Sequence, residues 1–491
     1  MTKARQLADL LDANGDVKST NLDNVPASDN ASALTSGTLP IARIADSAIT
    51  SAKIADGTIV PADLHNDAKV VKSGSAPSNP VEGNLWYDTT NDVLKVYDTG
   101  VNTFVKVSTV TPDLTSITGN IVNTLAGNLT LNGTGFLTQS LVVSFTPSGG
   151  SASTVTVTPS SDTTATVAIP SAIYGQSTDT VIGIKVTNSD TKSSGTLNST
   201  VVGLPSGGTI TSSGGYRIHT FTSSGTFANT ITNLSVQYLV IAGGGGSGRQ
   251  HGGGGGAGGY RCSVTGESSG GGASAETALT LSTGNKTVTV GGGGAASTGS
   301  EVRGGSGGDS VFDSITSIGG GGGGSYVTPT NNSAGNGLSG GSGGGGGAVE
   351  NSNSACGYGH PAGAGTANQG YAGGDSSYAG GGGGGASQVG EQGCGGSPAG
   401  DAGNGGNGLS SSITGSSVAR AGGGAGGSYG SSNQSTGSRG IATAGGGNGG
   451  WGNENGTDGT DGTGGGAGGG GVLGQGSSVG GDGIVIVRYQ I

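Results

Sequence analysis

The glycine content of residues 243–483 constrains this chain more than any other feature. Of the 491 residues in the chain, 114 are Gly, and most of them lie in this stretch, where Ser, Ala, Asn and Thr supply much of the remainder. A segment with so few large apolar side chains cannot build an ordinary hydrophobic core. Two interpretations follow: a disordered or elastic segment, or a fold whose order comes from the backbone itself.

Strand-like sequences at both edges of this stretch favour the ordered alternative. Residues 216–242 and 484–491 are rich in β-branched and aromatic residues, which is typical of β-strands. Two segments inside the stretch have the same character: residues 277–290, with a turn at 283–285, and residues 310–318. We therefore expect a frame of β-strands from which long glycine segments project.

Backbone chemistry leaves one regular structure for those segments. Gly disfavours α-helix by roughly 1 kcal/mol per residue relative to Ala. Collagen needs a Gly-X-Y period and many Pro, whereas this chain has 13 Pro. Without Cβ atoms, left-handed threefold helices of the polyglycine type can approach until the N–H of one meets the C=O of its neighbour. The predicted lattice segments are 243–246, 252–256, 319–324, 343–347, 380–385 and 464–466, with loops at the lattice ends between them.

The framing sequences resemble a known family. IHTFTSSGTF at 218–227 and YLVIAGGGG at 238–246 resemble the opening of the glycine-rich domain in phage tail fibres and adhesins, and GIVIVRY at 483–489 resembles its ending. The resemblance covers about half of the chain. It implies a sandwich of polyglycine helices whose tip loops contact a host receptor.

Charge and composition exclude several function classes. The chain has 19 Lys and Arg and a formal net charge of −11, so its overall field does not favour nucleic acid. It contains no apolar run near the roughly 18 residues that a membrane span needs. The first residues include no hydrophobic segment, so we expect no secretory signal peptide and a protein that stays in the producing cell unless it leaves inside a particle.

The first 71 residues are predicted to attach the chain and extend it. Residues 3–14 form a short amphipathic helix that ends at Gly15. Apolar residues then recur every five positions, at Leu39, Ile44, Ile49, Ile54, Ile59 and Leu64. One file of apolar residues is too few for a core, so we predict three chains wound together, with a single-chain pentapeptide-repeat β-helix as the alternative. The repeat resembles phage fibre shafts.

Two further β units precede the glycine-rich stretch. GNLWYDTTNDVLKVYD predicts two strands around residues 89–92, and we expect Trp86, Tyr87, Val96 and Tyr97 in its core rather than a sugar site. The sequence GNLWYDTT…LKVYD resembles short modules found in many phage structural proteins. Residues 109–204 predict an immunoglobulin-like sandwich of roughly seven strands. The expected strands include 128–131, 141–145, 154–158, 164–169, 181–187 and 199–204. NLTLNGTGF at 128–136 resembles the IPT/TIG type of this fold, a rigid spacer.

The titratable residues form no constellation that predicts catalysis. The histidines His65, His219, His251 and His360 lack the partners of a metal site, and no cofactor is expected. The cysteines Cys262, Cys356 and Cys394 are odd in number and widely spaced, so we expect free thiols rather than a disulfide framework. Asp458 and Asp461 suggest calcium weakly, and a plain turn is the preferred interpretation. We therefore predict no enzyme.

Recognition is easier to place, because a glycine lattice offers no side chains except in its inserts. Aromatic faces suit sugars and protein loops. The densest aromatic cluster consists of Tyr358, His360, Tyr371 and Tyr378, with Tyr326 and Trp451 outside it. The competing interpretation is that each Tyr only seals a lattice end.

These observations predict a mainly β, elongated multidomain fibre. Its parts are an N-terminal attachment segment (1–35), a repeat shaft (36–71), a small β unit (72–108), an IPT/TIG-like sandwich (109–204) and a glycine-rich receptor-binding domain (205–491). The expected function is that of a homotrimeric phage tail fibre or spike, assembled in the host cytoplasm. It would join a tail or baseplate protein at one end and a host polysaccharide or outer-membrane protein at the other. The alternatives are a structural or ice-binding glycine-rich protein and a fibre-borne polysaccharide depolymerase.

Overall fold

The computed structural model of the protein describes most of the chain from Val70 onward. The described residues are 70–90, 93–106, 110–137, 140–299, 301–327, 332–349, 356, 359–395, 400–428, 438–472 and 476–491. They belong to two compact units, residues 1–109 and 110–491. The predicted helix at 3–14 and the five-residue repeat lie outside the described residues.

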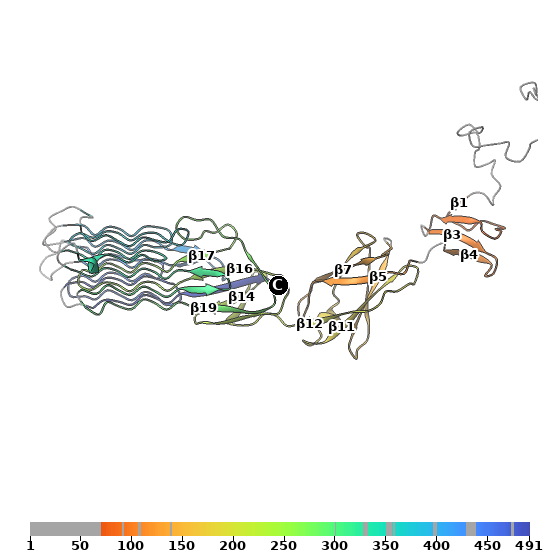
Figure 1. Cartoon of the computed structure of the whole chain (residues 1–491), viewed down its shortest axis with the longest axis horizontal. Coiled ribbons are helices and arrows are strands. Elements are labelled where there is room, and N and C mark those ends of the chain that lie inside the picture. Colours follow the sequence, from red (N-terminus) through yellow and green to blue (C-terminus); the bar gives the residue numbers. More distant parts are fainter. Residues whose placement is uncertain are drawn as a thin grey trace, which may run out of the picture. The chain divides into compact units, whose positions relative to one another are not determined.

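The first unit contains a four-stranded sheet, with the strands in chain order (Figure 1). Its strands are β1 (Val70–Ser73), β2 (Leu85–Asp88), β3 (Val93–Asp98) and β4 (Thr103–Lys106). The predicted strand pair around residues 89–92 is confirmed by β2 and β3. Trp86 is buried, packs edge-on against Phe104 at 5.2 Å, and lies under the Lys95 ammonium at 4.4 Å. A core role for Trp86 is therefore confirmed, while Tyr87 and Tyr97 are half-buried.

Residues 110–202 form a sandwich of two antiparallel-rich sheets, ordered β10-β7-β5 and β6-β12-β11-β8-β9. The elements are β5 (Asp113–Thr118), β6 (Ile121–Val122), β7 (Asn128–Thr134), β8 (Leu141–Pro147), β9 (Ser153–Val157), β10 (Thr164–Ala168), α2 (Ser171–Tyr174), β11 (Val181–Asn188) and β12 (Leu197–Val202). Inward residues of both sheets share one buried cluster that includes Leu131 and Phe145. All six predicted strands are confirmed, with ends shifted by a few residues. The strands β5 and β6 were not predicted from the sequence, because a bulge interrupts β5 and β6 has only two residues.

Two more sheets form the frame of the glycine-rich part. One is ordered β13-β14-β24-β16-β17, with β18 also paired to β16, and the other is ordered β15-β19-β20-β21. The first consists of β13 (Thr209–Ser213), β14 (Tyr216–Phe221), β16 (Leu234–Ile241), β17 (Tyr260–Cys262), β18 (Leu279–Leu281) and β24 (Ile484–Gln490). The second consists of β15 (Gly225–Asn229), β19 (Gly284–Thr289), β20 (Ser310–Phe312) and β21 (Ile315–Ser317). The strand signals at both edges of the stretch are thus confirmed.

The strand β24 is buried on both faces, which explains its unbroken hydrophobic sequence. It lies between β14 and β16 and is antiparallel to both. Val485 and Val487 belong to the cluster that joins the two frame sheets. Ile484 and Ile486 point the other way, into a cluster that includes Ile413. A strand covered on both sides has no polar face, so it does not alternate.

Each of the two segments inside the stretch that were predicted as strands contains two separate strands in the structure. Residues 277–290 contain β18 and β19, which pair with β16 and β15 respectively and not with each other. The turn between them therefore carries the chain from one frame sheet to the other. Residues 310–318 form a tight hairpin of β20 and β21, with Asp313 in the left-handed conformation at its turn.

The glycine segments form a lattice of extended runs that lie side by side (Figure 1). In the run 243–248, consecutive N–H groups point to three different neighbours, and the pattern repeats every third residue. The donors, acceptors and N···O distances are Gly243 to Gly308 (3.0 Å), Gly244 to Gly481 (2.9 Å), Gly245 to Gly256 (2.8 Å), Gly246 to Gly305 (2.9 Å), Ser247 to Ser478 (3.0 Å) and Gly248 to Gly253 (3.0 Å). No residue of this run has a positive φ, so it is a left-handed helix of the polyproline II type.

The same run accepts hydrogen bonds from three further segments. The donors are Gly294, Ser297, Gly320, Gly323, Ala467 and Gly470. Six neighbours therefore surround the run, three as acceptors and three as donors, and both backbone groups are satisfied without any helix or sheet. The predicted polyglycine packing is confirmed for this run.

Close approach is the reason that these positions are Gly. A Cβ built on Gly244 would lie 2.1 Å from the carbonyl oxygen of Gly465, and one on Gly245 would lie 2.1 Å from that of Gly321. Such overlaps are with backbone, so no side-chain rotation relieves them. The lattice thus excludes side chains at these glycine positions, while small side chains such as those of Ser247 and Ala467 are buried at other positions of the runs.

The described residues are almost entirely β or extended, which confirms the mainly β class. A two-stranded sheet of β22 (Leu409–Ser411) and β23 (Val418–Arg420) completes the strands. Within the described ranges, helical structure is confined to α2 and the 3-10 turn η6 (Ser333–Gly335).

Candidate functional site at the tip of the lattice

Each run of the lattice has one end at the frame and one end at a turn. The run 243–248 begins directly after β16, ends at a turn through Gln250, and residues 252–258 return to β17. We call the turn ends that lie away from the frame the tip. The described residues of the tip include 249–251, 298–299, 301–302, 326–327, 332–334, 356, 377–378, 394–395, 428, 451–453 and 472.

An aromatic group forms around His251 at the tip. The His251 ring lies 5.6 Å from the Tyr326 ring and 6.4 Å from the Tyr378 ring, between centroids. The Tyr326 N–H donates to the carbonyl of Arg249 at 3.1 Å, which fixes the turn at 249–251 against the turn at 326–327. His251 is buried, and this burial lowers its pKa to about 4, so its ring is neutral at pH 7. Both tyrosines keep part of their surface in solvent.

His360 is buried and packs against residues of the tip turns. Its side chain is fully buried, and its Nε2 lies 3.4 Å from the Val327 carbonyl oxygen. Burial lowers its pKa and outweighs this hydrogen bond, which acts in the opposite direction. A Cβ on Gly335 would overlap the His360 ring at 2.1 Å. His360 therefore fills the space above a glycine.

Trp451 lies at the same end of the lattice. It forms a parallel bridge with Ser428, and the following Gly452 accepts a hydrogen bond from Val472. The His251 N–H donates to Gly471, the residue before Val472, so these turns adjoin each other. Trp451 as a residue is partly exposed.

Tyr371 lies at the opposite end of the lattice from the other described aromatic residues of the predicted cluster. Its hydroxyl is 2.8 Å from the position of a Cβ on Gly272, in the segment between β17 and β18. Spacing in the sequence misled here, because each run spans the lattice and successive inserts alternate between its ends. Tyr358 lies outside the described residues.

A disulfide joins two tip loops, which corrects the expectation of free thiols at these positions. Cys356 and Cys394 are bonded, with their Cα atoms 4.1 Å apart and a sequence separation of 38. The wide spacing of the cysteines did not predict this disulfide, because the runs bring residues at the same end of the lattice together whatever their separation in sequence. Cys262 is free and buried, and burial raises its pKa to about 12, so this thiol stays protonated.

Two carboxylates at the frame line a shared hollow but are already fully engaged. Glu276 accepts from Arg261 at 2.6 and 2.8 Å and from the Tyr238 hydroxyl at 2.7 Å. Burial would raise its pKa, but these hydrogen bonds outweigh burial and lower it. Glu267 accepts from the backbone and hydroxyl of Ser412, and its pKa is likewise lowered against the effect of burial. Neither carboxylate therefore has the raised pKa that a general acid needs.

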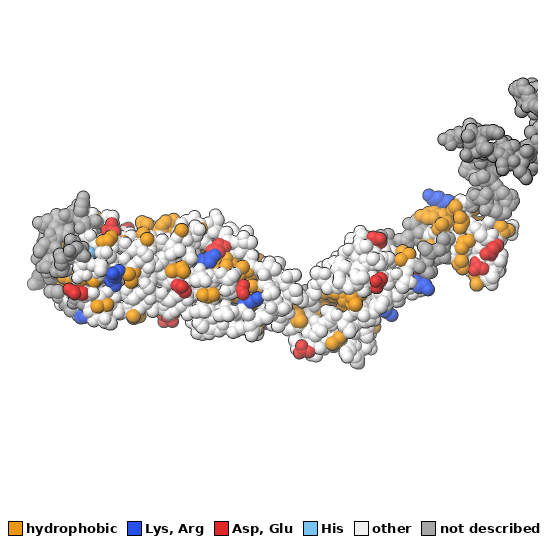
Figure 2. All heavy atoms as spheres, viewed as in Figure 1, with side chains coloured by type: hydrophobic (Ala, Val, Ile, Leu, Met, Phe, Trp, Pro, Cys, Tyr) orange, Lys and Arg blue, Asp and Glu red, His pale blue; other side chains and the backbone are white. Residues whose placement is uncertain are grey.

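The described residues also lack two other kinds of site. They contain no group of three or more metal-ligating side chains. None of their helices has the length and hydrophobicity of a membrane span. On the face drawn in Figure 2, charged side chains are few and scattered over the lattice, so no single-sign patch marks a binding surface there.

A ladder of polar side chains closes the edge of the lattice, and sequence analysis missed it. Its members form two series, 401/404 and 455/458/461, that each recur every third residue, in step with the threefold helix, and accept from the N–H groups of the neighbouring run. The acceptor–donor pairs are Asp401–Ser438, Asn404–Ile441, Asn455–Gly476, Asp458–Val479 and Asp461–Asp482, at 2.7–3.0 Å. Asp461 begins a turn over residues 461–464, as the sequence analysis preferred, whereas Asp458 lies outside it. An Asn/Asp spacing of three in a glycine-rich run was the available signal.

Comparison with known proteins agrees with this architecture in part. A family model described as a glycine-rich domain matches residues 220–490. A solved structure of the FN1–FN3 domains of chicken CNTN1 is similar at 14% sequence identity, over 30% of this chain and 57% of that chain, with a TM-score of 0.16. Likeness at that level carries no argument about the fold. No curated protein matches the chain.

Proposed function

The chain belongs to the glycine-rich domain family, and on this premise we propose that it is a phage tail fibre or spike protein that attaches the particle to the host surface. We place the receptor contact at the tip. The N-terminal end would join a tail or baseplate protein, and the protein would reach its place in the virion after assembly in the host cytoplasm.

The grouping of side chains at the tip carries the proposal. At the closely packed glycine positions of the lattice a side chain would overlap the neighbouring backbone, so large side chains that could give specificity have to reside in the turns. Tyr326, Tyr378 and Trp451 lie at these turns, which a network of backbone hydrogen bonds holds, and each of the three residues is partly exposed. Large aromatic surfaces presented without further ordering lose little entropy on binding, which suits sugars and protein loops.

We propose no reaction for this protein. The frame carboxylates Glu267 and Glu276 have lowered pKa values and are saturated with hydrogen bonds, which disfavours a depolymerase. A homotrimer would multiply a weak contact at each tip, because the second and third contacts become intramolecular. Reducing-sugar release from host envelope by the full chain would contradict this part of the proposal.

The test is binding of the full-length protein to cells of its bacterial host. We expect Tyr378→Ala and Trp451→Ala to weaken binding by about tenfold or more each, equivalent to roughly 1.4 kcal/mol. Tyr371→Ala is the matched control, because Tyr371 is a half-buried Tyr of the same lattice at the frame end. Thermal unfolding of each variant separates lost contact from lost fold. Equal weakening by Tyr371→Ala, with unchanged unfolding, would move the site away from the tip.

A further inference from the structure

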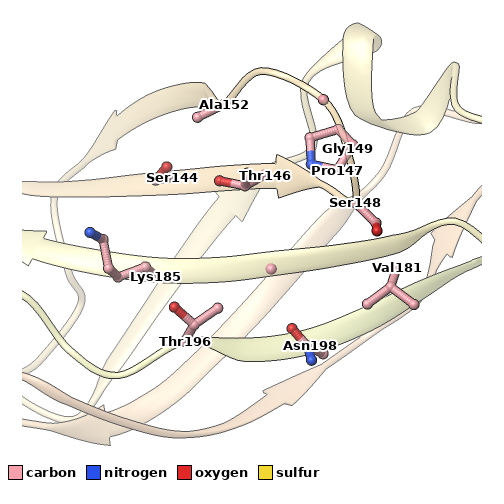
Figure 3. A pocket seen from close by; sticks show the side chains of 12 residues that line it. Ser144, Thr146, Pro147, Ser148, Gly149, Ala152, Val181, Lys185, Thr196 and Asn198 are labelled. Carbon is pink, nitrogen blue, oxygen red and sulfur yellow. The ribbon is translucent and has the colours of Figure 1, made fainter.

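The outer face of the larger sandwich sheet carries an open groove of about 700 Å³ (Figure 3). Ser144 and Thr146 of β8 line one side, and Thr196 and Asn198 line the other. The strand β11 runs along the floor between them. In register, Gly183 lies opposite both Thr146 and Asn198, and Lys185 lies opposite Ser144.

Gly183 makes the hollow. Its neighbours along the outer face of β11 are Val181 and Lys185, so a position that would carry a side chain is empty at the centre of the sheet. A Cβ there would already meet the Thr196 Cγ2 at 3.0 Å. Gly weakens a strand interior and in that place often marks a close approach of another molecule. Here no other part of the described chain fills the space.

The β8–β9 turn walls one end of the groove. The Ser148 N–H donates to the Val181 carbonyl at 2.8 Å, which ties the turn to β11. Gly149 adopts the left-handed conformation with a φ of 75°, and the Gly150 N–H closes the turn on Pro147. The wall is therefore held by backbone hydrogen bonds, so the groove is preformed.

The polar groups of the groove have no partners within the described chain. The hydroxyls of Ser144, Thr146 and Thr196 make no hydrogen bond there, and neither do the Asn198 amide and the Lys185 ammonium, in contrast to many polar side chains elsewhere in the unit. The lining contains one cation, no carboxylate and no aromatic ring. Such a surface matches a ligand rich in hydroxyl groups and neutral or weakly anionic.

We propose that this groove binds an oligosaccharide segment. The hydroxyls and the Asn198 amide exchange hydrogen bonds with sugar hydroxyls, and the floor at Gly183 admits a ring. The Lys185 ammonium donates to a sugar hydroxyl or to a uronic carboxylate. The site goes beyond the proposed tip function, because it lies on the sandwich and uses none of the tip residues. It gives the chain a second contact with a saccharide-coated surface.

The test uses the full-length protein on a microarray of neutral and uronic-acid-containing oligosaccharides. We expect Gly183→Val to fill the floor and reduce the bound signal by at least about tenfold. The matched control is Gly127→Val, because Gly127 is exposed in the same sandwich and a Cβ there meets only the Ile169 Cδ1 at an ordinary 3.7 Å. Lys185→Gln distinguishes the two sugar classes: it lowers binding of uronic oligosaccharides and leaves neutral ones nearly unchanged.

The two proposals fail separately. Tyr378→Ala and Trp451→Ala are expected to leave array binding by the groove unchanged, whatever they do to cell binding. The groove proposal is overturned if no saccharide binds the wild-type protein, or if Gly183→Val with unchanged thermal unfolding binds as the wild type does. It is also overturned if Gly127→Val reduces the signal equally.

Discussion

The sandwich at residues 110–202 and the lattice at residues 243–483 are held together by opposite means. In the sandwich, side chains from both sheets fill one apolar cluster, and each fully buried Leu, Val, Ile or Phe contributes about 1.5–3 kcal/mol. In the lattice, the backbone of each run satisfies its neighbours directly, and a Cβ would overlap a carbonyl at about 2 Å. The sandwich therefore requires side-chain volume, and the lattice excludes it at its closely packed glycine positions.

This difference decides which substitutions each part tolerates. A core built from side chains loses stability when a side chain is removed, because a cavity remains. A core built from backbone has no side chain to remove and loses stability when one is added. The frame combines both, since Val485 and Ile486 fill clusters on its two faces while Gly483 next to them meets the lattice.

The largest expected effect comes from a small-to-large substitution in the lattice. Gly245→Val places a Cβ 2.1 Å from the Gly321 carbonyl oxygen, and six surrounding runs prevent relaxation, so we expect the lattice not to form. The same change at Gly292 is the control, because a Cβ there meets only the Asp482 Oδ1 at 3.7 Å. Hydrogen exchange resolved by peptide would show lost protection across 243–483 for the first variant alone. Native protection in Gly245→Val would refute the backbone-core description.

The converse substitution should damage the sandwich alone. Phe145 is fully buried, and Phe145→Ala is expected to cost about 3–5 kcal/mol through lost burial and a cavity. The exposed Thr156→Ala on β9 serves as the control. Peptide-resolved exchange should rise in 110–204, with lattice peptides unchanged. A parallel loss in the lattice would mean that the two parts unfold as one cooperative unit.

Mild acid should separate the two parts as well. His219, His251 and His360 all have pKa values lowered by burial, to about 4 for His251, whereas residues 110–204 contain no His. Because the unfolded chain takes up protons below about pH 6.5 and the folded chain does not, stability falls as the pH drops from about 6.5 towards 4. At pH 5, His251 alone accounts for about 2 kcal/mol. Thermal unfolding at pH 7 and at pH 5 measures this loss of stability. The prediction would be contradicted if the unfolding transition of the lattice were the same at both pH values, or if no His→Gln variant restored the stability lost at pH 5.

The smallest expected effect concerns the polar ladder at the lattice edge. Asn404 accepts from the Ile441 N–H at 2.7 Å and donates to Glu391 at 2.8 Å. Asn404→Ala is expected to cost about 0.5–1.5 kcal/mol, because water can replace part of the lost bonding at this exposed site. Asn453→Ala, at an exposed residue without a side-chain hydrogen bond in the described chain, is the control. Denaturant titration compares the free energies of unfolding of the two variants. Equal values would mean that the polar ladder does not stabilise the lattice.

Local sequence chemistry predicted the strands well and the site poorly. The strands β14, β16 and β24 followed from β-branched runs, and the strands of the sandwich from alternation and turn residues. The aromatic cluster did not follow, because Tyr371 and Tyr378 are close in sequence yet lie at opposite lattice ends. The Cys356–Cys394 disulfide was missed for the same reason. Nothing in a run of glycines records which other runs surround it.

By itself, the sequence determined that this chain has a lattice at all. Glycine runs too poor in apolar side chains for a core, bounded by hydrophobic strands, leave polyglycine packing as the one ordered solution. Only the tertiary structure decided the neighbours of each run, and with them the members of the tip, the disulfide and the polar ladder. The physical reason is that backbone hydrogen bonds are identical at every glycine, so pairing between runs is set by the frame and the turn lengths and not by the residues that pair.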